Sequence, residues 1–335
     1  MKVLFDHPNP FLLAHGGFQI QIEQTKKALE GIGVEVEWLR WWDSTQNADI
    51  IHFFGRPYPA YITLAHQRGM KVVISELLTS MGSRSASARF AQKTLITLCR
   101  ALLPRDFTAK MSWDAYRVVD AATALTPWEK QLMVEMFDAP PDRVHVIPNG
   151  VEEVFFQRTP NQEQRTPHSD YLVCTATITE RKRIVELAEA ATLAKTPLWI
   201  IGAPYSDSDP YYLRFLEVVR GSGGTLRYEG AISDRARLAE IYRSAQGFVL
   251  LSSMESMSLS ALEASAAGCP LLLSDIPWAR NAFCNNATYA PVTTTQSLAK
   301  HIGDFYNNSA KLQIATAPMT WHQIAKHLHR VYKSL

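Results

Sequence analysis

The stretch GFVLLSSMESMSLSALEASAAGCPLLLSD, from Gly247 to Asp275, consists of two short apolar runs on either side of an alanine-rich segment with helical character. Apolar runs of this length that bracket a helix predict two parallel strands joined by a crossover helix. The helical segment should be surrounded by protein on several sides, yet it carries Glu255 at its amino-terminal end and Glu263 about two turns further along. Because an unpaired buried carboxylate is costly, we expect both acids either to have partners or to bind a ligand.

The same alternation of apolar runs and helical patterns extends through the rest of the chain. The amino-terminal half contains KVLFD, VEVEWLR, ADIIHFFG, KVVISE and AATALTP, and the carboxyl-terminal half adds YLVCTATI, PLWIIGA and TLRYEGA. This alternation predicts an α/β protein with two doubly wound, Rossmann-like domains, which would face each other across a cleft at the carboxyl ends of their strands. A polar, proline-bearing segment at residues 155–168 is the candidate linker, so we predict domains at 1–157 and 158–318.

Composition indicates a globular protein, because 47% of the 335 residues are hydrophobic and 20% are charged. The net charge is +2, and the chain has no basic tail or RNA-stacking motif, so no nucleic-acid partner is expected. The opening MKVLFDHPNP contains no apolar signal region, so we expect a cytoplasmic protein that begins near Met1. The four cysteines are isolated along the chain and are interpreted as reduced thiols.

A family resemblance emerges from the order of several motifs. RVHVIPNGVE, IIGA, LRYEGAISDRARLAEIYRSAQGFVLLSSMESMSLSALEASAAGCPLLLSD and the closing WHQIAKHLHRVYKSL resemble the retaining nucleotide-sugar glycosyltransferases of family 4, which have the GT-B fold. The resemblance is strongest from Asp142 to Asp275. It implies a metal-independent enzyme without a cofactor that takes a UDP- or GDP-sugar donor and a hydroxyl acceptor, in polysaccharide or glycoconjugate synthesis. It also implies that the last helix, within 319–335, returns to the amino-terminal domain.

The two glutamates of the opening stretch match the family's E-x7-E motif. The resemblance implies that Glu255 faces the donor sugar and that Glu263 binds the nucleotide ribose, and a carboxylate can hold two vicinal hydroxyls at once. Met257, Ser258 and Leu259 open the helix, where backbone N–H groups and the helix dipole favour a phosphate. The alternative is that Glu255 is only a helix-terminal charge and that Glu263 is exposed or salt-bridged.

Three cations, Arg181, Lys182 and Arg183, lie together at a predicted helix start, where the helix dipole disfavours positive charge. Their placement therefore indicates an anion site. The resemblance implies that Lys182 stabilises the leaving diphosphate, as a fixed cation can. This chain departs from the family at Thr177, where arginine is usual, so either Arg181 or Arg183 supplies the missing charge, or Lys182 acts with backbone amides alone. The resemblance also places Gly202, Gly230, Ala231 and Ile232 at the donor.

In the amino-terminal half, Gly16 and Gly17 precede a predicted helix and would allow close approach of a ligand to its first turn. Together with His15, Gly16 and Gly17 form a loop that is predicted to contact either the donor phosphate or the acceptor. Glu76 follows the KVVISE strand, where many family members carry a histidine, and is a candidate for orienting a sugar hydroxyl.

Two further segments allow two interpretations each. Residues 84–117 hold seven Lys or Arg against Asp106 and Asp114 and form either a basic amphipathic surface for an anionic membrane or an ordinary surface helix. The Asp207-Ser208-Asp209 triplet resembles a metal-binding D-x-D, but its acids are better placed to cap a helix near Pro210. For the whole chain, the alternatives to a transferase are a non-catalytic nucleotide-sugar-binding subunit of the same fold and a nucleotide-sugar epimerase.

Overall fold

The computed structural model describes residues 1–8, 11, 16–108, 110–156, 169–312 and 317–335. The chain divides into two compact units. The amino-terminal unit comprises Met1–Asn149 and Trp321–Leu335, and the carboxyl-terminal unit comprises Gly150–Thr320. The predicted boundary at residue 157 lies outside the described residues.

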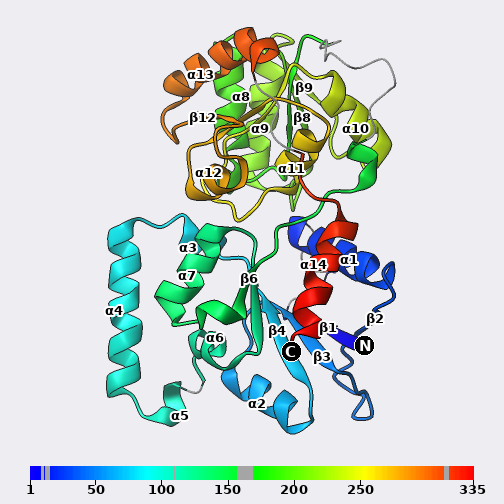
Figure 1. The fold of residues 1–335 in the computed structure, drawn as a ribbon. Helices are drawn as coiled ribbons and strands as arrows, with labels where there is room; N and C mark the ends of the chain where they lie inside the picture. The colour runs from blue at the N-terminus through cyan, green and yellow to red at the C-terminus, as the bar shows by residue number, and fades with distance from the viewer. Residues whose placement is uncertain (9–10, 12–15, 109, 157–168, 313–316) are drawn as a thin grey trace. The chain divides into compact units, whose positions relative to one another are not determined.

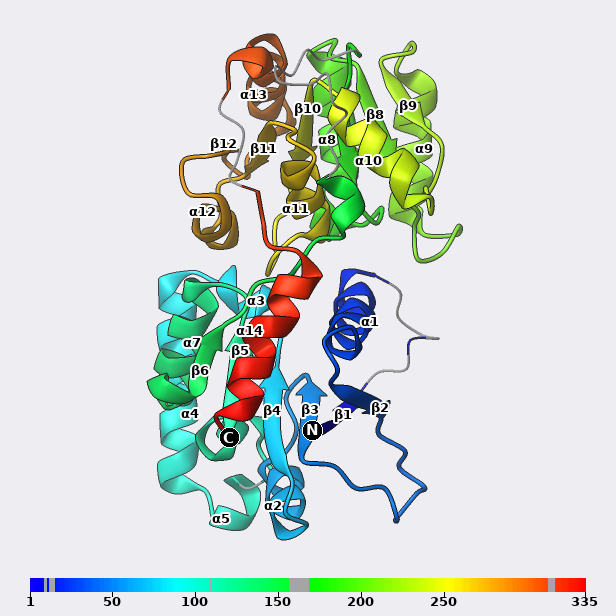
Figure 2. The same ribbon diagram turned by 45° about the vertical axis from the view of Figure 1, so that its right-hand side comes forward.

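The amino-terminal unit is built on a six-stranded parallel sheet in the order β2-β1-β3-β4-β5-β6 (Figures 1 and 2). Chain order reverses between β1 and β3, which makes this pair the topological switch point of the sheet. Its strands are β1 Lys2–Asp6, β2 Glu35–Trp38, β3 Ile50–Phe54, β4 Lys71–Ser75, β5 Ala121–Ala124 and β6 Val144–Val146. Its longer helices are α1 Gly17–Glu30, α2 Pro59–Gln67, α4 Ala86–Leu102, α7 Pro127–Phe137 and α14 Trp321–Lys333, and its short ones are α3 Thr79–Gly82, α5 Arg105–Thr108 and α6 Ala115–Val118.

The last helix, α14, lies beside α1 on the amino-terminal sheet, as the views in Figures 1 and 2 agree. Its Ile324, Leu328 and Tyr332 share one face and are all buried. The Tyr332 hydroxyl is 2.5 Å from Nδ1 of His52, and Nε2 of the same ring is 2.6 Å from the Ser75 hydroxyl. Burial lowers the pKa of His52 to about 3, so the ring is neutral and links helix to sheet through hydrogen bonds alone.

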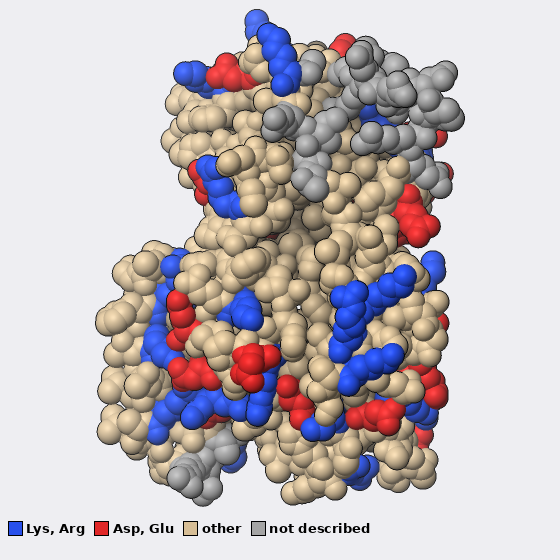
Figure 3. Space-filling view, in the orientation of Figure 1, with Lys and Arg blue, Asp and Glu red and all other residues tan. Residues whose placement is uncertain are grey.

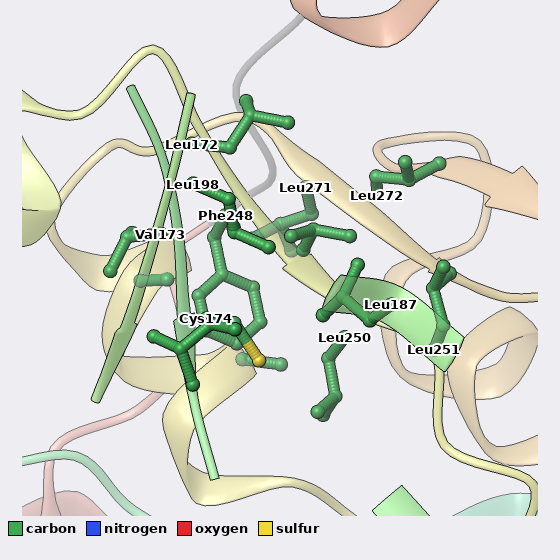
Figure 4. Close-up of a cluster of buried hydrophobic side chains, with 14 of the residues drawn as sticks. Leu172, Val173, Cys174, Leu187, Leu198, Phe248, Leu250, Leu251, Leu271 and Leu272 are labelled. Atoms are coloured by element: carbon green, nitrogen blue, oxygen red, sulfur yellow. The ribbon is translucent and has the colours of Figure 1, made fainter. Parts of the chain in front are cut away.

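The carboxyl-terminal unit repeats this architecture with the strand order β12-β11-β10-β7-β8-β9, all parallel. Chain order reverses between β7 and β10. Figure 4 shows its core, in which Leu172, Cys174, Phe248 and Leu250 from these two strands lie among leucines of β8 and β11. Its strands are β7 Leu172–Thr175, β8 Leu198–Ile201, β9 Leu226–Tyr228, β10 Gly247–Leu250, β11 Leu271–Ser274 and β12 Thr288–Ala290, and its helices are α8 Ile184–Leu193, α9 Pro210–Gly221, α10 Arg235–Ser244, α11 Leu259–Ala266, α12 Pro277–Phe283 and α13 Thr295–Asn308.

The strands form where continuous apolar runs occur because strands of a doubly wound sheet are covered on both faces. All four residues of β8, β10 and β11 are buried. The opening stretch is confirmed as strand, helix and strand, and Asp209 caps α9 by accepting from the Tyr211 N–H at 2.9 Å.

Two expectations need correction. Part of the segment assigned to the linker belongs to the fold, because Phe155 is fully buried and its ring lies 5.9 Å from that of Tyr242. Residues 157–168 of that segment lie outside the described residues. The strand β12 was not predicted, since a short strand at a sheet edge with only one buried residue has no clear apolar run.

None of the helices in the described ranges is long and apolar enough to cross a bilayer.

Candidate active site

The predicted donor-side residues follow four strands of the carboxyl-terminal sheet. Lys182 follows β7, Gly202 follows β8, Gly230 follows β9 and Glu255 follows β10. Because all these strands are parallel, their carboxyl ends lie along one edge of the sheet, and β7 and β10 flank its topological switch point. The edge at such a point is where open α/β sheets bind ligands.

The loops after β7 and β10 are held together by hydrogen bonds. The Ser253 N–H and hydroxyl both donate to the Arg181 carbonyl oxygen, at 2.9 and 3.1 Å. The Arg181 guanidinium in turn donates to the Met254 carbonyl oxygen at 2.9 Å. These contacts place Arg181 and Lys182 beside Glu255.

Glu255 is buried and forms an ion pair with Lys182, whose side chain is 12% exposed. Nη1 of Arg181 lies 3.4 Å from the same Glu255 oxygen. Two cations therefore converge on one carboxylate oxygen, so the three side chains together carry a net positive charge. An anionic group placed there would replace the carboxylate as a partner of the cations.

Arg183 points elsewhere. Its Nη2 donates to the Thr293 carbonyl oxygen at 2.7 Å, beyond the end of β12, and its backbone is left-handed with φ of 53°. Of the two arginines that could compensate for Thr177, Arg181 is the one at Glu255. Thr177 itself is half-buried in the loop after β7.

Glu263 is buried within α11 and forms a salt bridge. A salt-bridged Glu263 was part of the alternative to ribose binding in the sequence analysis. Its partner is Arg235 of α10, which also donates from Nε to Glu152 at 2.8 Å and lies 4.8 Å above the Phe155 ring. Burial raises the pKa of Glu263 to about 7, and the charge and hydrogen bond of Arg235 act in the opposite direction. This carboxyl therefore titrates near neutral pH.

Sequence reasoning missed Arg235. The residue lies 28 positions from Glu263 and 83 from Glu152, so no local spacing links the three charges. The only signal was Asp234, which caps α10 by accepting from the N–H groups of Ala236 and Arg237 and so fixes where the helix begins.

The start of α11 is close to the predicted position. The helix begins at Leu259, and the Ser258 hydroxyl caps it by accepting from the Ala261 N–H at 3.4 Å. Met257 precedes the cap and packs against the hydrophobic core of the unit. The helix is eight residues long, begins four residues after Glu255 and contains Glu263.

Gly202 is required by the packing of the loop after β8. Its φ is +152°, and a Cβ at this position would lie 1.8 Å from the Ala176 carbonyl oxygen. Its N–H donates to the Gly230 carbonyl oxygen at 2.9 Å, and its own carbonyl accepts from the Tyr228 hydroxyl. Gly202 thus joins the loops after β7 and β9, and Ala231 and Ile232 follow Gly230 directly.

In the amino-terminal unit, Gly16 precedes α1 with φ of 151°, and Gly17 is the first residue of the helix. His15 lies outside the described residues. Glu76 follows β4, where its carboxylate accepts from Nε and Nη2 of Arg56, at 2.7 and 2.9 Å, and from the Tyr116 hydroxyl. Its charge is therefore compensated within the unit.

Comparisons with known proteins agree with this architecture. The family described as glycosyl transferases group 1 matches residues 156–317, and the glycosyl transferase 4-like domain matches residues 27–150. Between them the two matches cover every strand of both sheets except β1.

Curated relatives are distant. D-inositol 3-phosphate glycosyltransferase of Acidothermus cellulolyticus is 28% identical over 181 residues, which cover 49% of this chain and 40% of the relative. O-antigen chain mannosyltransferase B of Escherichia coli is 22% identical over 263 residues, which cover 72% of this chain and 68% of the relative. The chain thus matches less than half the length of the first of these relatives.

Solved structures match over the whole chain. Sucrose-phosphate synthase from Thermosynechococcus elongatus superposes with a TM-score of 0.74 at 17% identity, covering 100% of this chain and 99% of the other. HepE of Anabaena, solved with UDP and glucose, superposes with a TM-score of 0.69 at 14% identity, and the match covers 100% of both chains. With a 4-like domain at residues 27–150 and a group 1 domain at 156–317, the chain belongs to the glycosyltransferases of the GT-B fold.

Proposed function

We propose that this chain transfers a sugar from a nucleoside-diphosphate sugar to a hydroxyl acceptor with retention of the anomeric configuration. The observation that carries the proposal is the convergence of Lys182 and Arg181 on Glu255 at the switch point of the donor-side sheet. Two cations at this position suit a diphosphate, and a carboxylate beside them suits sugar hydroxyls. Relatives that carry the names of a mannosyltransferase and an inositol phosphate glycosyltransferase support the reaction class.

In the proposed reaction, the bond between the anomeric carbon and the diphosphate oxygen breaks while the acceptor oxygen forms a bond on the same face. The acceptor proton passes to the departing phosphate oxygen, so no protein nucleophile is needed. Lys182 and Arg181 stabilise the charge that grows on the diphosphate. Glu255 then exchanges its partner Lys182 for hydroxyls of the transferred sugar.

The remaining donor-side residues bind the nucleotide. Glu263 accepts hydrogen bonds from the ribose hydroxyls, and the backbone of Met257, Ser258 and Leu259 at the start of α11 faces the phosphates. The loops of Gly202 and of Gly230 to Ile232 form the base side, and Thr177 lies in the adjoining loop. UDP is the first nucleotide to test because HepE was solved with UDP and with UDP-glucose.

The amino-terminal unit supplies the acceptor side in this proposal. Gly16 and Gly17 provide the backbone of the first turn of α1, together with His15. Glu76 has one oxygen, Oε1, that accepts a single hydrogen bond from Arg56, so this atom can accept another from an acceptor hydroxyl.

A donor panel tests the proposal. The purified chain is incubated with UDP- and GDP-linked hexoses in the presence of a chelator, and release of the nucleoside diphosphate is measured with and without hydroxyl acceptors. We expect slow release from one donor, accelerated by one acceptor class, with NMR showing the donor's anomeric configuration in the product. An inverted product would contradict retention. Binding without release under every condition would instead favour the non-catalytic binding subunit.

Replacing Arg235 with methionine is expected to move the pH dependence of nucleotide binding. Ribose hydroxyls need the ionised carboxylate of Glu263, so wild-type binding should weaken as pH falls through about 7. Arg235 lowers the pKa of Glu263. Loss of Arg235 should therefore raise the pH at which nucleotide binding is half-maximal by about one pH unit or more, as expected when an opposite charge within about 4–6 Å is removed. Titration calorimetry with UDP between pH 6 and 9 measures this shift.

Arg237→Met is the matched control, because Arg237 lies on the same helix but pairs with the exposed Glu229 at 3.1 Å. It should leave the midpoint unchanged. A 2′,3′-dideoxy nucleoside diphosphate should show no Arg235-dependent shift, since it lacks the hydroxyls. If UDP binding depends on pH in the same way in wild type and in Arg235→Met, Glu263 does not bind the ribose as proposed.

A further inference from the structure

The loops after β3 and β4 of the amino-terminal unit are tied together at the carboxyl edge of its sheet. The Gly55 N–H, directly after β3, donates to the Ser75 carbonyl oxygen at 2.8 Å. Gly55 has a φ of +135°, which side chains rarely adopt, and a Cβ there would lie 3.4 Å from the Pro8 ring. The residues that follow, Arg56 and Glu76, are therefore brought together next to the switch point between β1 and β3, where open α/β sheets bind ligands.

Arg56 and Glu76 form a two-pronged ion pair that rests on aromatic rings. The Arg56 guanidinium donates from Nε and Nη2 to the two carboxylate oxygens of Glu76. It lies 4.1 Å from the centre of the Phe137 ring and 5.3 Å from that of the Tyr116 ring, and these two rings are stacked and fully buried. The rings and the paired hydrogen bonds together fix the orientation of both charged groups.

The hydrogen-bonding capacity of the pair is only partly used. Oε2 of Glu76 accepts from Nε of Arg56 and from the Tyr116 hydroxyl, whereas Oε1 accepts from Nη2 alone. Within the described residues, Nη1 of Arg56 makes no hydrogen bond and is not a buried atom. The pair therefore keeps one acceptor position open on Oε1 and one donor group open on Nη1.

The Arg56–Glu76 pair is largely enclosed. Its side chains are 17% and 19% exposed, against 30% and 47% for Lys93 and Asp138, which pair at the surface of the same unit. Figure 3 shows such surface charges, with Lys and Arg next to Asp and Glu between α4 and α7. An enclosed ion pair adds little net stability, because the cost of desolvation offsets the attraction. With its place at the ligand-binding edge, this favours a role in recognition.

The charges around the open groups suit a neutral ligand. Arg56 and Glu76 together carry no net charge. Glu129 of α7 is buried, and its charge, like burial and the charge of Glu76, raises the pKa of Tyr116, so it lies close to the pair. An anionic group at Nη1 would be attracted by one cation and repelled by two carboxylates. A ligand without charge avoids this repulsion.

We propose that Arg56 and Glu76 together bind two adjacent hydroxyls of a neutral sugar acceptor, with Oε1 of Glu76 accepting from one and Nη1 of Arg56 donating to the oxygen of the other. A hydroxyl both donates and accepts, so a vicinal diol matches the two open groups of the pair. The inference rests on the proposed function and adds the acceptor class to it: a glycan or glycoside with a vicinal diol beside the hydroxyl that receives the sugar. Sequence reasoning missed Arg56, since 20 residues separate it from Glu76.

Transfer assays with matched acceptors test the proposal. The purified full chain is given the donor found in the panel and, as acceptors, methyl glycosides of neutral hexoses, their monodeoxy derivatives and the corresponding methyl uronides. Wild type should prefer the neutral glycoside to its uronide. Removing either recognised hydroxyl, while the one that receives the sugar is kept, should lower kcat/KM by about tenfold or more, the usual effect of losing a hydrogen bond to a charged group.

Arg56→Met should lower kcat/KM for the parent glycoside by about tenfold or more. It should cause no further loss with the derivative that lacks the hydroxyl bound by Arg56, and Glu76→Gln should behave in the same way with the other derivative. A residue with only a structural role would lower the rate on all acceptors alike. Arg40→Met is the matched control, because Arg40 pairs with Asp43 at 2.9 Å in the loop after β2, and it should act as wild type on every acceptor.

The folding of the variants is checked by thermal melting. Arg56→Met leaves the enclosed Glu76 without its cation, so the double variant Arg56→Met/Glu76→Gln supplies a site without charges. Replacing both members of an enclosed pair is often close to neutral for stability, so this variant should melt near wild type. It should also discriminate less between the parent glycoside and both deoxy derivatives than wild type does.

Four results would overturn the proposal: equal losses on parent and deoxy acceptors, a uronide used better than the neutral glycoside, wild-type behaviour of Arg56→Met, or no transfer to any neutral glycoside by a chain that releases diphosphate from its donor. In each of these cases the proposed transferase still stands if wild type transfers sugar to another acceptor. A wild type that releases no diphosphate from any donor, with or without acceptor, would overturn the proposed function and this inference together.

Discussion

Lys182→Ala is expected to lower kcat for sugar transfer by about 100-fold or more, since removing one fixed charge-stabilising group from an active site typically has an effect of this size. The affinity for the donor should change much less, because the charge on the diphosphate grows mainly as its bond to the sugar breaks. Steady-state kinetics with the donor identified in the panel measure kcat and KM separately.

The fold should survive this change. Arg181 stays 3.4 Å from the Glu255 carboxylate, so the buried acid keeps a cationic partner. Arg183→Ala is the control from the same cluster, and it should keep kcat within a few fold because Arg183 is directed to the Thr293 carbonyl. Lys182→Arg should recover part of the lost rate. A Lys182→Ala enzyme that turns over within tenfold of wild type would exclude Lys182 from the chemistry.

Gly202→Ala should both destabilise the carboxyl-terminal unit and abolish donor binding. The added Cβ would lie 1.8 Å from the Ala176 carbonyl oxygen, which is backbone and can move away only if the loop after β7 moves. The hydrogen bond from Gly202 to Gly230 would also be broken or distorted. We expect a cost of about 3 kcal/mol or more, the range of severe backbone and packing clashes, and a melting temperature lower by roughly 10 °C.

Gly303→Ala is the matched control within the same unit. Gly303 lies inside α13, and a Cβ there would meet only the Ala194 Cβ at 4.0 Å. Alanine in a helix interior is favoured over glycine, so this variant should be as stable as wild type or slightly more stable. Differential scanning calorimetry and a UDP-binding assay measure both variants. An unchanged melting temperature and intact UDP binding in Gly202→Ala would show that the loop packing is not required.

The sequence predicted most of the fold because strands covered on both faces are continuous apolar runs that can be recognised locally. Of the twelve strands within the described residues, eleven fall on quoted runs or motifs, and the edge strand Thr288–Ala290 was missed. The return of the last helix was implied by family resemblance and is present, fixed by Tyr332 to His52. Such long-range hydrogen bonds leave no trace in local periodicity.

The candidate site was predicted in part. Lys182 and Glu255 were identified from a motif order and are in contact, 73 residues apart, because β7 and β10 are neighbours in the sheet. Their roles in transfer, and that of Glu263, stay predictions until the variants are measured. The choice between Arg181 and Arg183 could not be made from sequence, since adjacent side chains on a short turn point in different directions.

The sequence by itself predicted the class of fold, membership of the GT-B glycosyltransferases and the segments proposed to form the site, because these depend on apolar periodicity and on motifs within a few tens of residues. Tertiary structure alone decided which charges meet. Arg235 joins Glu263 to Glu152, Arg181 rather than Arg183 reaches Glu255, and the cations of α4 turn inward to Asp114 and Asp138. Ion pairs form between whichever groups the packing of the sheets and helices brings within about 4 Å, and that distance is a property of the folded chain.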